Sequence, residues 1–115
     1  MSNYMLARLK LEFGVGNLIR YNEAMKSIRE FFEDEGVMLQ HAFITSVGPV
    51  CEAWNLWKID DHAHWERAMA RGNDERVYAK YEDVLNTMQE VVAEENLSLL
   101  DTMPFFMESP PASRA

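Results

Sequence analysis

Residues 50–61 read VCEAWNLWKIDD, and this stretch decides the fold because it predicts a strand that runs into a helix. Its first ten residues contain no glycine or proline and are rich in the aromatic and apolar types that favour strands. Gly48-Pro49 before it indicates a turn, and Asp60-Asp61 at its end indicates a helix start. We therefore expect a strand over residues 50–59 that is entered from a tight turn.

Aromatic side chains occupy both faces of this predicted strand. Side chains alternate along a strand, so Asn55 and Trp57 share one face with Cys51, while Trp54 lies on the other. Large aromatic groups on both faces need cover on both sides of the sheet. This requirement shapes the expected architecture.

The length and composition indicate one domain. A chain of 115 residues buries enough surface to hold a core without disulfide bonds. The single Cys51 excludes an internal disulfide, which favours a reducing, cytoplasmic setting. A formal net charge of −8 argues against nucleic acid and anionic membrane as partners, and no apolar run is long enough to span a bilayer. We expect a single domain over residues 1–108 and a disordered tail over residues 109–115.

Periodicity predicts the remaining elements. A first helix is expected to start after an Asn17 cap and to end at Gly36. The acids Glu90 and Glu94-Glu95 are interpreted as solvated helix faces and ends. The expected strands are residues 4–13, 37–47, 50–59 and 97–103, and the expected helices are residues 18–35, 62–71 and 77–92, the last two capped by Asp61 and by Asn73 or Asp74.

The order strand, helix, strand, strand, helix in two pieces, strand is the βαββαβ pattern of ferredoxin-like α+β folds. It predicts a four-stranded antiparallel sheet with the helices on one face, which leaves the other face bare. That face carries Arg8 and Lys10 beside large apolar groups, and such a surface should not stay exposed in a monomer. The simplest cover is a second copy related by a two-fold axis, so we expect a homodimer.

The stretch from Gly48 to Asp61 resembles the central signature of the NIPSNAP family, in which a glycine-marked turn leads into a strand that ends in a leucine–tryptophan pair before an acidic helix start. Residues 67–81 look like that family's next helical segment. Met103-Pro104-Phe105 is similar to its closing strand and Pro-Phe element. The resemblance covers residues 6–106.

The resemblance implies a dimeric α/β barrel, in which the sheets of two ferredoxin-like subunits face each other. That superfamily includes cofactor-free monooxygenases acting on polycyclic aromatics, haem-degrading monooxygenases, isomerases and polyketide cyclases, so the fold alone does not fix the function. Family members carry an arginine followed two residues later by a tyrosine on the first strand, whereas here Arg8 is followed by Lys10. A role for that tyrosine does not carry over.

Asn55 and Trp57 are expected to bind substrate. A strand-end tryptophan at the Trp57 position lines the active cavity in the monooxygenases that this chain resembles, and there an asparagine from another strand binds a substrate oxygen. Pockets of this kind are apolar with few polar groups. A core tryptophan and a satisfied core amide explain the same two residues, and the sequence leaves both interpretations open.

Tyr78, Tyr81 and His41 are candidates for acid–base catalysis. The tyrosine hydroxyls can donate to a ligand carbonyl or act as general acids, with core packing as the alternative. His41, expected on one strand face with Leu39 and Phe43, can act as a base near neutral pH or be a satisfied core or edge histidine. Haem-binding relatives usually take their iron ligand from the second helix, where this chain has tyrosines, which argues against haem.

No metal site is expected. His62 and Glu66 share a helix face while His64 points elsewhere, and the sequence lacks the spacing of a metalloprotease helix. The first turn of a surface helix explains these residues better than a metal site.

Arg8 completes the expected substrate-binding residues. Its guanidinium can hold a ligand carboxylate or phenolate, or can pair with Glu12 or Glu52 across a dimer. We therefore expect a homodimer that needs no cofactor and acts on an aromatic or polyketide-like small organic molecule as a monooxygenase, cyclase or isomerase. The alternative is a non-catalytic module that binds a small ligand or a protein.

Overall fold

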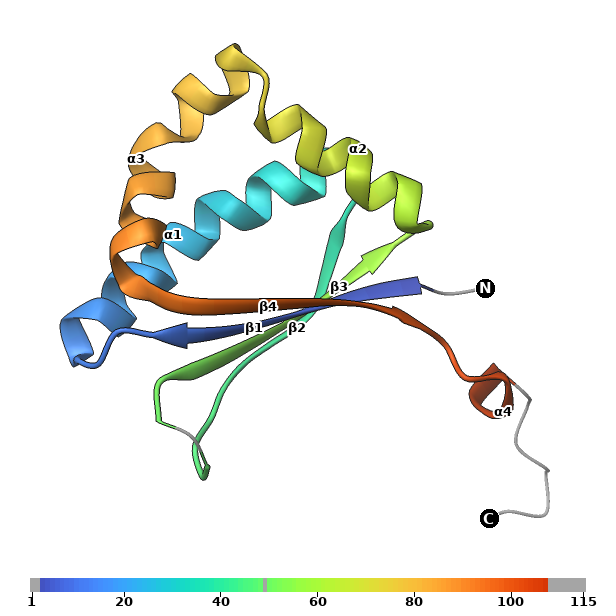
Figure 1. The fold of residues 1–115 in the computed structure, drawn as a ribbon, viewed down its shortest axis with the longest axis horizontal. Coiled ribbons are helices and arrows are strands. Elements are labelled where there is room, and N and C mark those ends of the chain that lie inside the picture. Colours follow the sequence, from blue (N-terminus) through green and yellow to red (C-terminus); the bar gives the residue numbers. More distant parts are fainter. Residues whose placement is uncertain (1–2, 49, 108–115) are drawn as a thin grey trace.

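The computed structural model describes residues 3–48 and 50–107. Within them the elements follow the expected order, and a short helix is added at the end (Figure 1). The tail predicted to be disordered, residues 109–115, lies outside the described residues. The elements are β1 (Asn3–Leu11), α1 (Val15–Asp34), β2 (Met38–Ile44), β3 (Glu52–Ile59), α2 (His62–Gly72), α3 (Glu75–Val91), β4 (Val92–Asp101) and α4 (Pro104–Met107).

The four strands form one antiparallel sheet in the order β2-β3-β1-β4. The helices α1, α2 and α3 lie over one face of this sheet and leave the other face open (Figure 1). The predicted ferredoxin-like α+β fold is therefore confirmed. The two middle strands, β1 and β3, come from distant parts of the sequence, and they carry most of the buried residues of the sheet.

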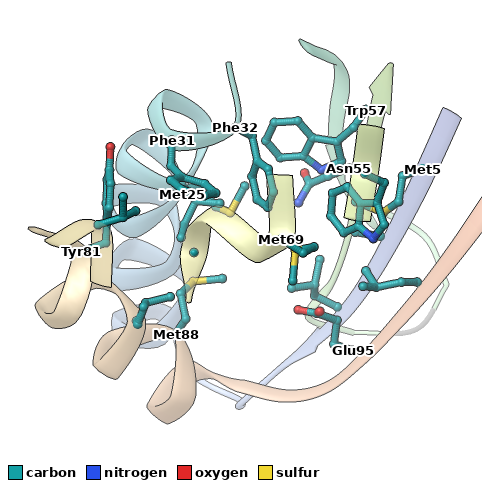
Figure 2. Close-up of a pocket in the computed structure, with 18 of the residues that line it drawn as sticks. Met5, Met25, Phe31, Phe32, Asn55, Trp57, Met69, Tyr81, Met88 and Glu95 are labelled. Carbon is teal, nitrogen blue, oxygen red and sulfur yellow. The ribbon is translucent and has the colours of Figure 1, made fainter. Parts of the chain in front are cut away.

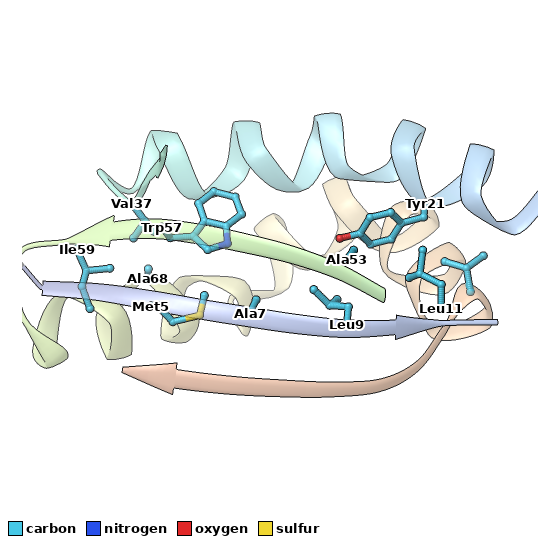
Figure 3. Packing of buried hydrophobic residues seen from close by; sticks show 11 residues of the cluster. Met5, Ala7, Leu9, Leu11, Tyr21, Val37, Ala53, Trp57, Ile59 and Ala68 are labelled. Carbon is cyan, nitrogen blue, oxygen red and sulfur yellow. The ribbon is translucent and has the colours of Figure 1, made fainter. Parts of the chain in front are cut away.

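The core lies between the sheet and the helices because apolar side chains alternate along both middle strands. Every second residue from Met5 to Leu11 is buried on β1, and the same holds from Ala53 to Ile59 on β3. The antiparallel register places Met5 opposite Trp57, which is among the largest fully buried side chains (Figure 3). The alternation predicted from the sequence is confirmed over β3.

The hairpin strands β2 and β3 are shorter than predicted at the ends nearest their turn. β3 begins at Glu52, because Cys51 adopts a φ of 58°, a left-handed conformation that lies outside regular strand geometry. The Val50 side chain is 67% exposed, and β2 ends at Ile44, three residues before the solvent-exposed Val47. Cys51 therefore belongs to the turn and not to the buried face of a strand.

β2 carries a bulge that reverses its alternation. Leu39 pairs with Trp57, but the next paired residue is His41, which lies opposite Leu56. Because one extra residue, Gln40, separates them, Leu39 faces the helices and His41 faces the open side of the sheet. The prediction that Leu39 and His41 share a face is wrong.

The helix starts agree with the sequence at two of three positions. α1 begins at Val15, before the predicted cap, and the Asn17 side chain donates to the Phe13 carbonyl from within the first turn (3.2 Å). The caps of the next two helices are confirmed. The carboxylates of Asp61 and Asp74 accept backbone N–H bonds at the starts of α2 and α3.

β4 begins at Val92, directly after the last residue of α3. The sequence predicts a helix through Val92 and a strand from residue 97, because Val91 and Val92 continue the helical spacing. In the structure Val92 pairs with Leu11, so sheet pairing starts five residues earlier. Glu94-Glu95 consequently lie on a strand, and their interpretation as a helix end is wrong.

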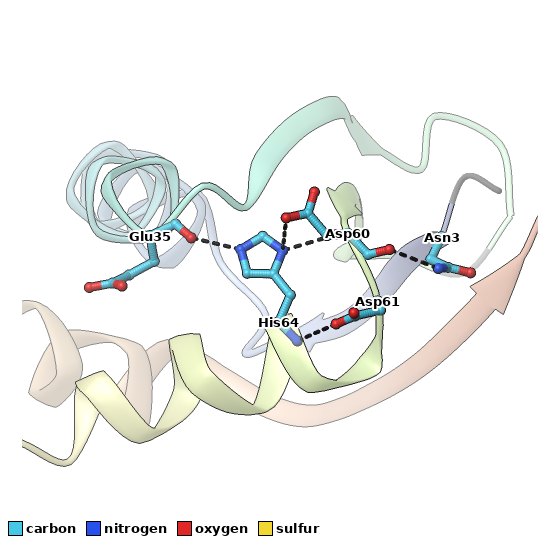
Figure 4. Close-up of polar contacts among 5 residues, drawn as sticks. All are labelled: Asn3, Glu35, Asp60, Asp61 and His64. Carbon is cyan, nitrogen blue, oxygen red and sulfur yellow. Dashed lines mark hydrogen bonds and ion pairs between the residues drawn. The ribbon is translucent and has the colours of Figure 1, made fainter.

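His64 joins three elements at one end of the sheet (Figure 4). Its side chain is buried, the Asp60 N–H donates to its Nδ1 (2.9 Å), and its Nε2 lies 2.7 Å from the Glu35 carbonyl oxygen. Because a carbonyl only accepts, Nε2 must carry the ring proton. His64 is thus a buried bridge between α1, β3 and α2 and not part of a surface turn, and both ring nitrogens are occupied.

Replacing His64 with alanine is expected to lower the free energy of unfolding by about 1–3 kcal/mol, because the buried imidazole is lost and the part-buried Glu35 carbonyl and Asp60 N–H lose their partner. The matched control is His62→Ala, on the exposed side of the same helix turn, which should change stability by less than about 0.5 kcal/mol. Urea unfolding followed by circular dichroism measures both. Equal effects of the two variants would contradict the bridging role.

Candidate functional site

A cavity of about 320 Å³ lies between the sheet and the helices α1, α2 and α3 (Figure 2). The sheet forms its floor, and side chains from all three helices form its walls and roof. Its lining includes Glu95 and Leu97 of β4, the edge strand of the sheet. The floor residues are Met5, Ala7, Leu9, Asn55, Trp57 and Leu97.

Aromatic side chains form part of the cavity walls, among methionine and aliphatic side chains. The Phe32 ring lies 5.0 Å from the Trp57 ring and stacks on the Trp65 ring at 5.3 Å. Further along α1, the Phe31 ring meets the Tyr81 ring edge-on at 5.5 Å. Such contacts hold the rings in fixed orientations, so the cavity presents preformed flat surfaces to an aromatic ligand.

Asn55 is a buried polar group on the floor of this cavity. Its side chain is 4% exposed, and its Nδ2 donates to the hydroxyl oxygen of Tyr21 on α1 (2.9 Å). Within residues 3–48 and 50–107 this is the one hydrogen bond of the amide side chain, which leaves Oδ1 and a second N–H for a ligand. Burial raises the pKa of Tyr21, although the bond from Asn55 opposes this, so the hydroxyl stays protonated.

Glu95 is a second polar group at the cavity, and it is not among the site residues predicted from the sequence. Its register partner is Leu9, a buried residue, so Glu95 faces the helices. Partial burial raises the pKa of Glu95, although the residue as a whole is exposed to solvent. The alternation of Glu95 with Leu97 and Leu99 is the signal that could have found it.

The two predicted tyrosines line the cavity from α3. Tyr81 is buried, and Tyr78 is half-exposed. Figure 2 shows the Tyr81 hydroxyl directed away from Asn55 and Glu95. The structure therefore brings Tyr78 and Tyr81 to the same cavity as Asn55 and Trp57, but it separates the Tyr81 hydroxyl from the polar part of the floor.

Arg8 and His41 lie on the opposite face of the sheet. The Arg8 guanidinium lies over the Trp54 ring at 4.7 Å and pairs with the Glu52 carboxylate of the same chain at 3.5 Å. The His41 ring stacks on Phe43 at 5.6 Å. The structure thus divides the six predicted site residues, with four at the cavity and two on the open face.

The open face of the sheet carries an apolar patch on β2 and β3, beside charged residues such as Arg8 and Glu52. Phe43 is 60% exposed there, and the half-buried Trp54 and Leu56 lie next to it. A recess of about 350 Å³ runs between them. Its lining residues are Leu6, Phe43, Ile44, Thr45, Trp54 and Leu56.

Two kinds of feature are absent from the described part of the chain. None of its helices is both long and apolar enough to cross a bilayer. No group of three or more His, Cys, Asp or Glu side chains is arranged to hold a metal ion there.

Comparison with known proteins gives matches among solved structures only. No family model matches the sequence, and no curated protein does. A NIPSNAP family protein from Agrobacterium tumefaciens matches with a TM-score of 0.73 and 12% identity over 91% of this chain and 96% of its own. An uncharacterized NIPSNAP-like domain protein from Burkholderia xenovorans matches with a TM-score of 0.72 and 19% identity over 96% of this chain and 90% of its own.

A third match comes from outside that group. SnoaB, a cofactor-independent oxygenase from Streptomyces nogalater, has a TM-score of 0.66 and 10% identity over 93% of this chain and 98% of its own. Identities this low establish the fold and leave the function open. The resemblance predicted from the sequence is confirmed at that level: this chain has the ferredoxin-like fold of NIPSNAP proteins.

Proposed function

We propose that this protein is a cofactor-free enzyme that acts on an aromatic or polyketide-like small molecule in the cavity under α1, α2 and α3. The observation that carries the proposal is the combination of flat aromatic walls with a buried, partly unpaired amide at Asn55. An open cavity of this size favours an enzyme over a pure interaction module, which could fill the same space with side chains. Among the monooxygenase, cyclase and isomerase alternatives, the fold similarity to SnoaB, a cofactor-independent oxygenase, supports the monooxygenase.

Each part of the cavity has a role in this proposal. Trp57 and Phe32 hold the ring system by stacking and exclude water from it. Asn55 binds a ligand oxygen and so fixes which edge of the ring faces the floor. Tyr21 holds the Asn55 amide in place through the 2.9 Å hydrogen bond. Because the amide binds the ligand oxygen, Asn55→Ala should weaken binding of an oxygenated ligand.

We also propose that the chain works as a homodimer through the open face of its sheet. Phe43, Trp54 and Leu56 form an apolar surface that no helix covers within the described residues. A second copy placed on this face by a two-fold axis would cover each such surface with an identical one. Arg8 and His41 would then lie at the interface between copies.

Filling the cavity tests the proposed ligand site. Leu97→Trp adds a large ring to the cavity floor, and it should reduce the affinity for 2-methoxynaphthalene by at least about tenfold, because most of the binding volume is lost. Leu99→Trp is the matched control. Leu99 lies on the same face of β4 with similar exposure but does not line the cavity.

Isothermal titration measures both affinities. Equal loss of binding in the two variants, or none in either, would contradict the placement of the ligand. Catalysis is tested separately, by incubating the protein with hydroxynaphthalenes in the presence and absence of oxygen and analysing products by mass spectrometry. Ligand recovered unchanged from a protein that binds it would favour the non-catalytic module.

A further inference from the structure

Glu95 is the one carboxyl group among the described residues that line the cavity. β4 brings it there through its pairing with β1, in which Glu95 lies opposite Leu9 and Leu97 opposite Ala7. Residues in register share a face, so the Glu95 side chain rises from the floor that also carries Asn55 (Figure 2). Its neighbour Glu94, opposite Lys10, projects from the other face of the sheet.

The Glu95 carboxyl has no partner that would hold it in a structural role. In the part of the chain that the structure describes, no lysine or arginine forms an ion pair with it, and no side chain hydrogen-bonds to it. No cationic side chain lines the cavity there either. Glu95 is an exposed residue, so water reaches its carboxyl, but the apolar side chains that line the cavity beside it remove part of that solvation. Its anion is therefore a better proton acceptor than that of an acid fully in water.

Asn55, the other polar residue of the cavity floor, is complementary to Glu95. Asn55 and Glu95 lie on the two strands that flank β1, where Asn55 pairs with Ala7 and Glu95 with Leu9, so two strand spacings and a two-residue offset, together roughly 12 Å, separate their backbones. A flat ligand lying across β1 can reach both residues. Asn55 has an N–H to offer to one ligand oxygen, while Glu95 can take a proton from another.

The geometry points to Glu95 as the acid–base residue of the cavity and to a ring ligand that presents an acidic hydroxyl to it. This inference rests on the proposed function and assigns that function its proton acceptor. The Glu95 carboxylate takes the hydroxyl proton. The ligand O–H bond breaks, an O–H bond forms on Glu95, and the electron pair stays on the ligand as an oxyanion. The reverse transfer returns the proton to the product.

The alternatives for this role are less well placed. His41, a candidate base from the sequence, lies on the opposite face of the sheet. The Tyr81 hydroxyl points away from the polar floor. Tyr21 is held protonated, since burial raises its pKa and the nearby Glu95 charge raises it further, so it cannot serve as the base near neutral pH.

2-Naphthol provides a direct test, because excitation makes it a much stronger acid and its anion emits at longer wavelength. With protein in excess at neutral pH, bound 2-naphthol should show anion emission, which reports a proton acceptor within hydrogen-bond reach of the hydroxyl. Glu95→Gln should abolish that emission, since an amide is a poor proton acceptor. Glu94→Gln, the matched control on the other face, should leave it unchanged.

2-Methoxynaphthalene has the same rings but no proton, and it separates binding from proton transfer. We expect it to bind all three proteins with equal affinity. If both probes bind but Glu95→Gln retains the anion emission, the role of Glu95 is overturned while the proposed function stands. If neither probe binds the wild-type protein, both proposals are contradicted. A Glu95-dependent preference for 2-naphthylmethylammonium over 2-naphthol would identify the carboxylate as a counter-ion and would also overturn this assignment.

Discussion

Replacing Trp57 with alanine is expected to lower the free energy of unfolding by about 3–5 kcal/mol. Trp57 is 2% exposed and packs against Met5 on the neighbouring strand and against the Phe32 ring on α1. Removing the indole deletes contacts to both layers at once. Because a cavity already lies next to Trp57, few side chains are in position to fill the space that the indole leaves. The lost contacts are therefore not replaced.

Two companion variants sharpen this result. Trp57→Phe keeps a ring against Phe32 and should lose clearly less stability than Trp57→Ala. Lys58→Ala, at the next and exposed position of β3, should change stability by less than about 0.5 kcal/mol. Urea unfolding followed by circular dichroism avoids the loss of tryptophan fluorescence. A cost below about 1 kcal/mol for Trp57→Ala would show that the indole does not hold the sheet to α1.

A single acid on the open face is expected to convert the protein from dimer to monomer. Leu56→Glu places a carboxylate among Phe43 and Trp54, where a second copy would bury it without a partner. An unpaired charge at such a site costs about 3 kcal/mol or more, roughly a hundredfold in affinity, and the two-fold axis repeats the penalty in the other copy. The fold itself should persist, because the side chain faces solvent in the monomer.

Light scattering coupled to gel filtration measures the outcome directly. Ile19→Glu is the control, since Ile19 is an exposed apolar residue on α1, away from the open face. We expect the wild-type protein and Ile19→Glu to elute as dimers and Leu56→Glu as a monomer with an unchanged circular dichroism spectrum. A monomeric wild-type protein would contradict the proposed homodimer and leave the cavity under the helices unaffected.

The element order could be predicted from the sequence because its apolar periods are long and consistent. β1 and β3 alternate without a break over their buried faces, and Asp61 and Asp74 mark the starts of α2 and α3. These are local signals that depend on neighbouring residues in the chain. The same alternation placed Asn55 and Trp57 correctly on the face that now borders the cavity.

What could not be predicted depends on contacts between distant segments. The bulge at Gln40 reverses the face of His41, and nothing in the residue types around it distinguishes a bulge from a regular strand. The start of β4 is fixed by its pairing with Leu11, which overrides the helical spacing of Val91 and Val92. Glu95 was therefore assigned to a helix end and was not predicted as a site residue. The cavity could not be predicted either, because it depends on how the helices pack over the sheet.

The position of β4 also bears on how copies of this chain can associate. Within residues 3–48 and 50–107, β4 pairs with β1 on one side only, so its other side is a sheet edge beside the exposed leucines at 97, 99 and 100. Such an edge is a template for open-ended strand addition and fibre growth. In an antiparallel edge-to-edge contact of full overlap, Glu94-Glu95 near one end of β4 would face Asp101 at the other end of the second copy's β4. Repulsion between these carboxylates disfavours that route and leaves the apolar face as the surface through which a second copy can approach.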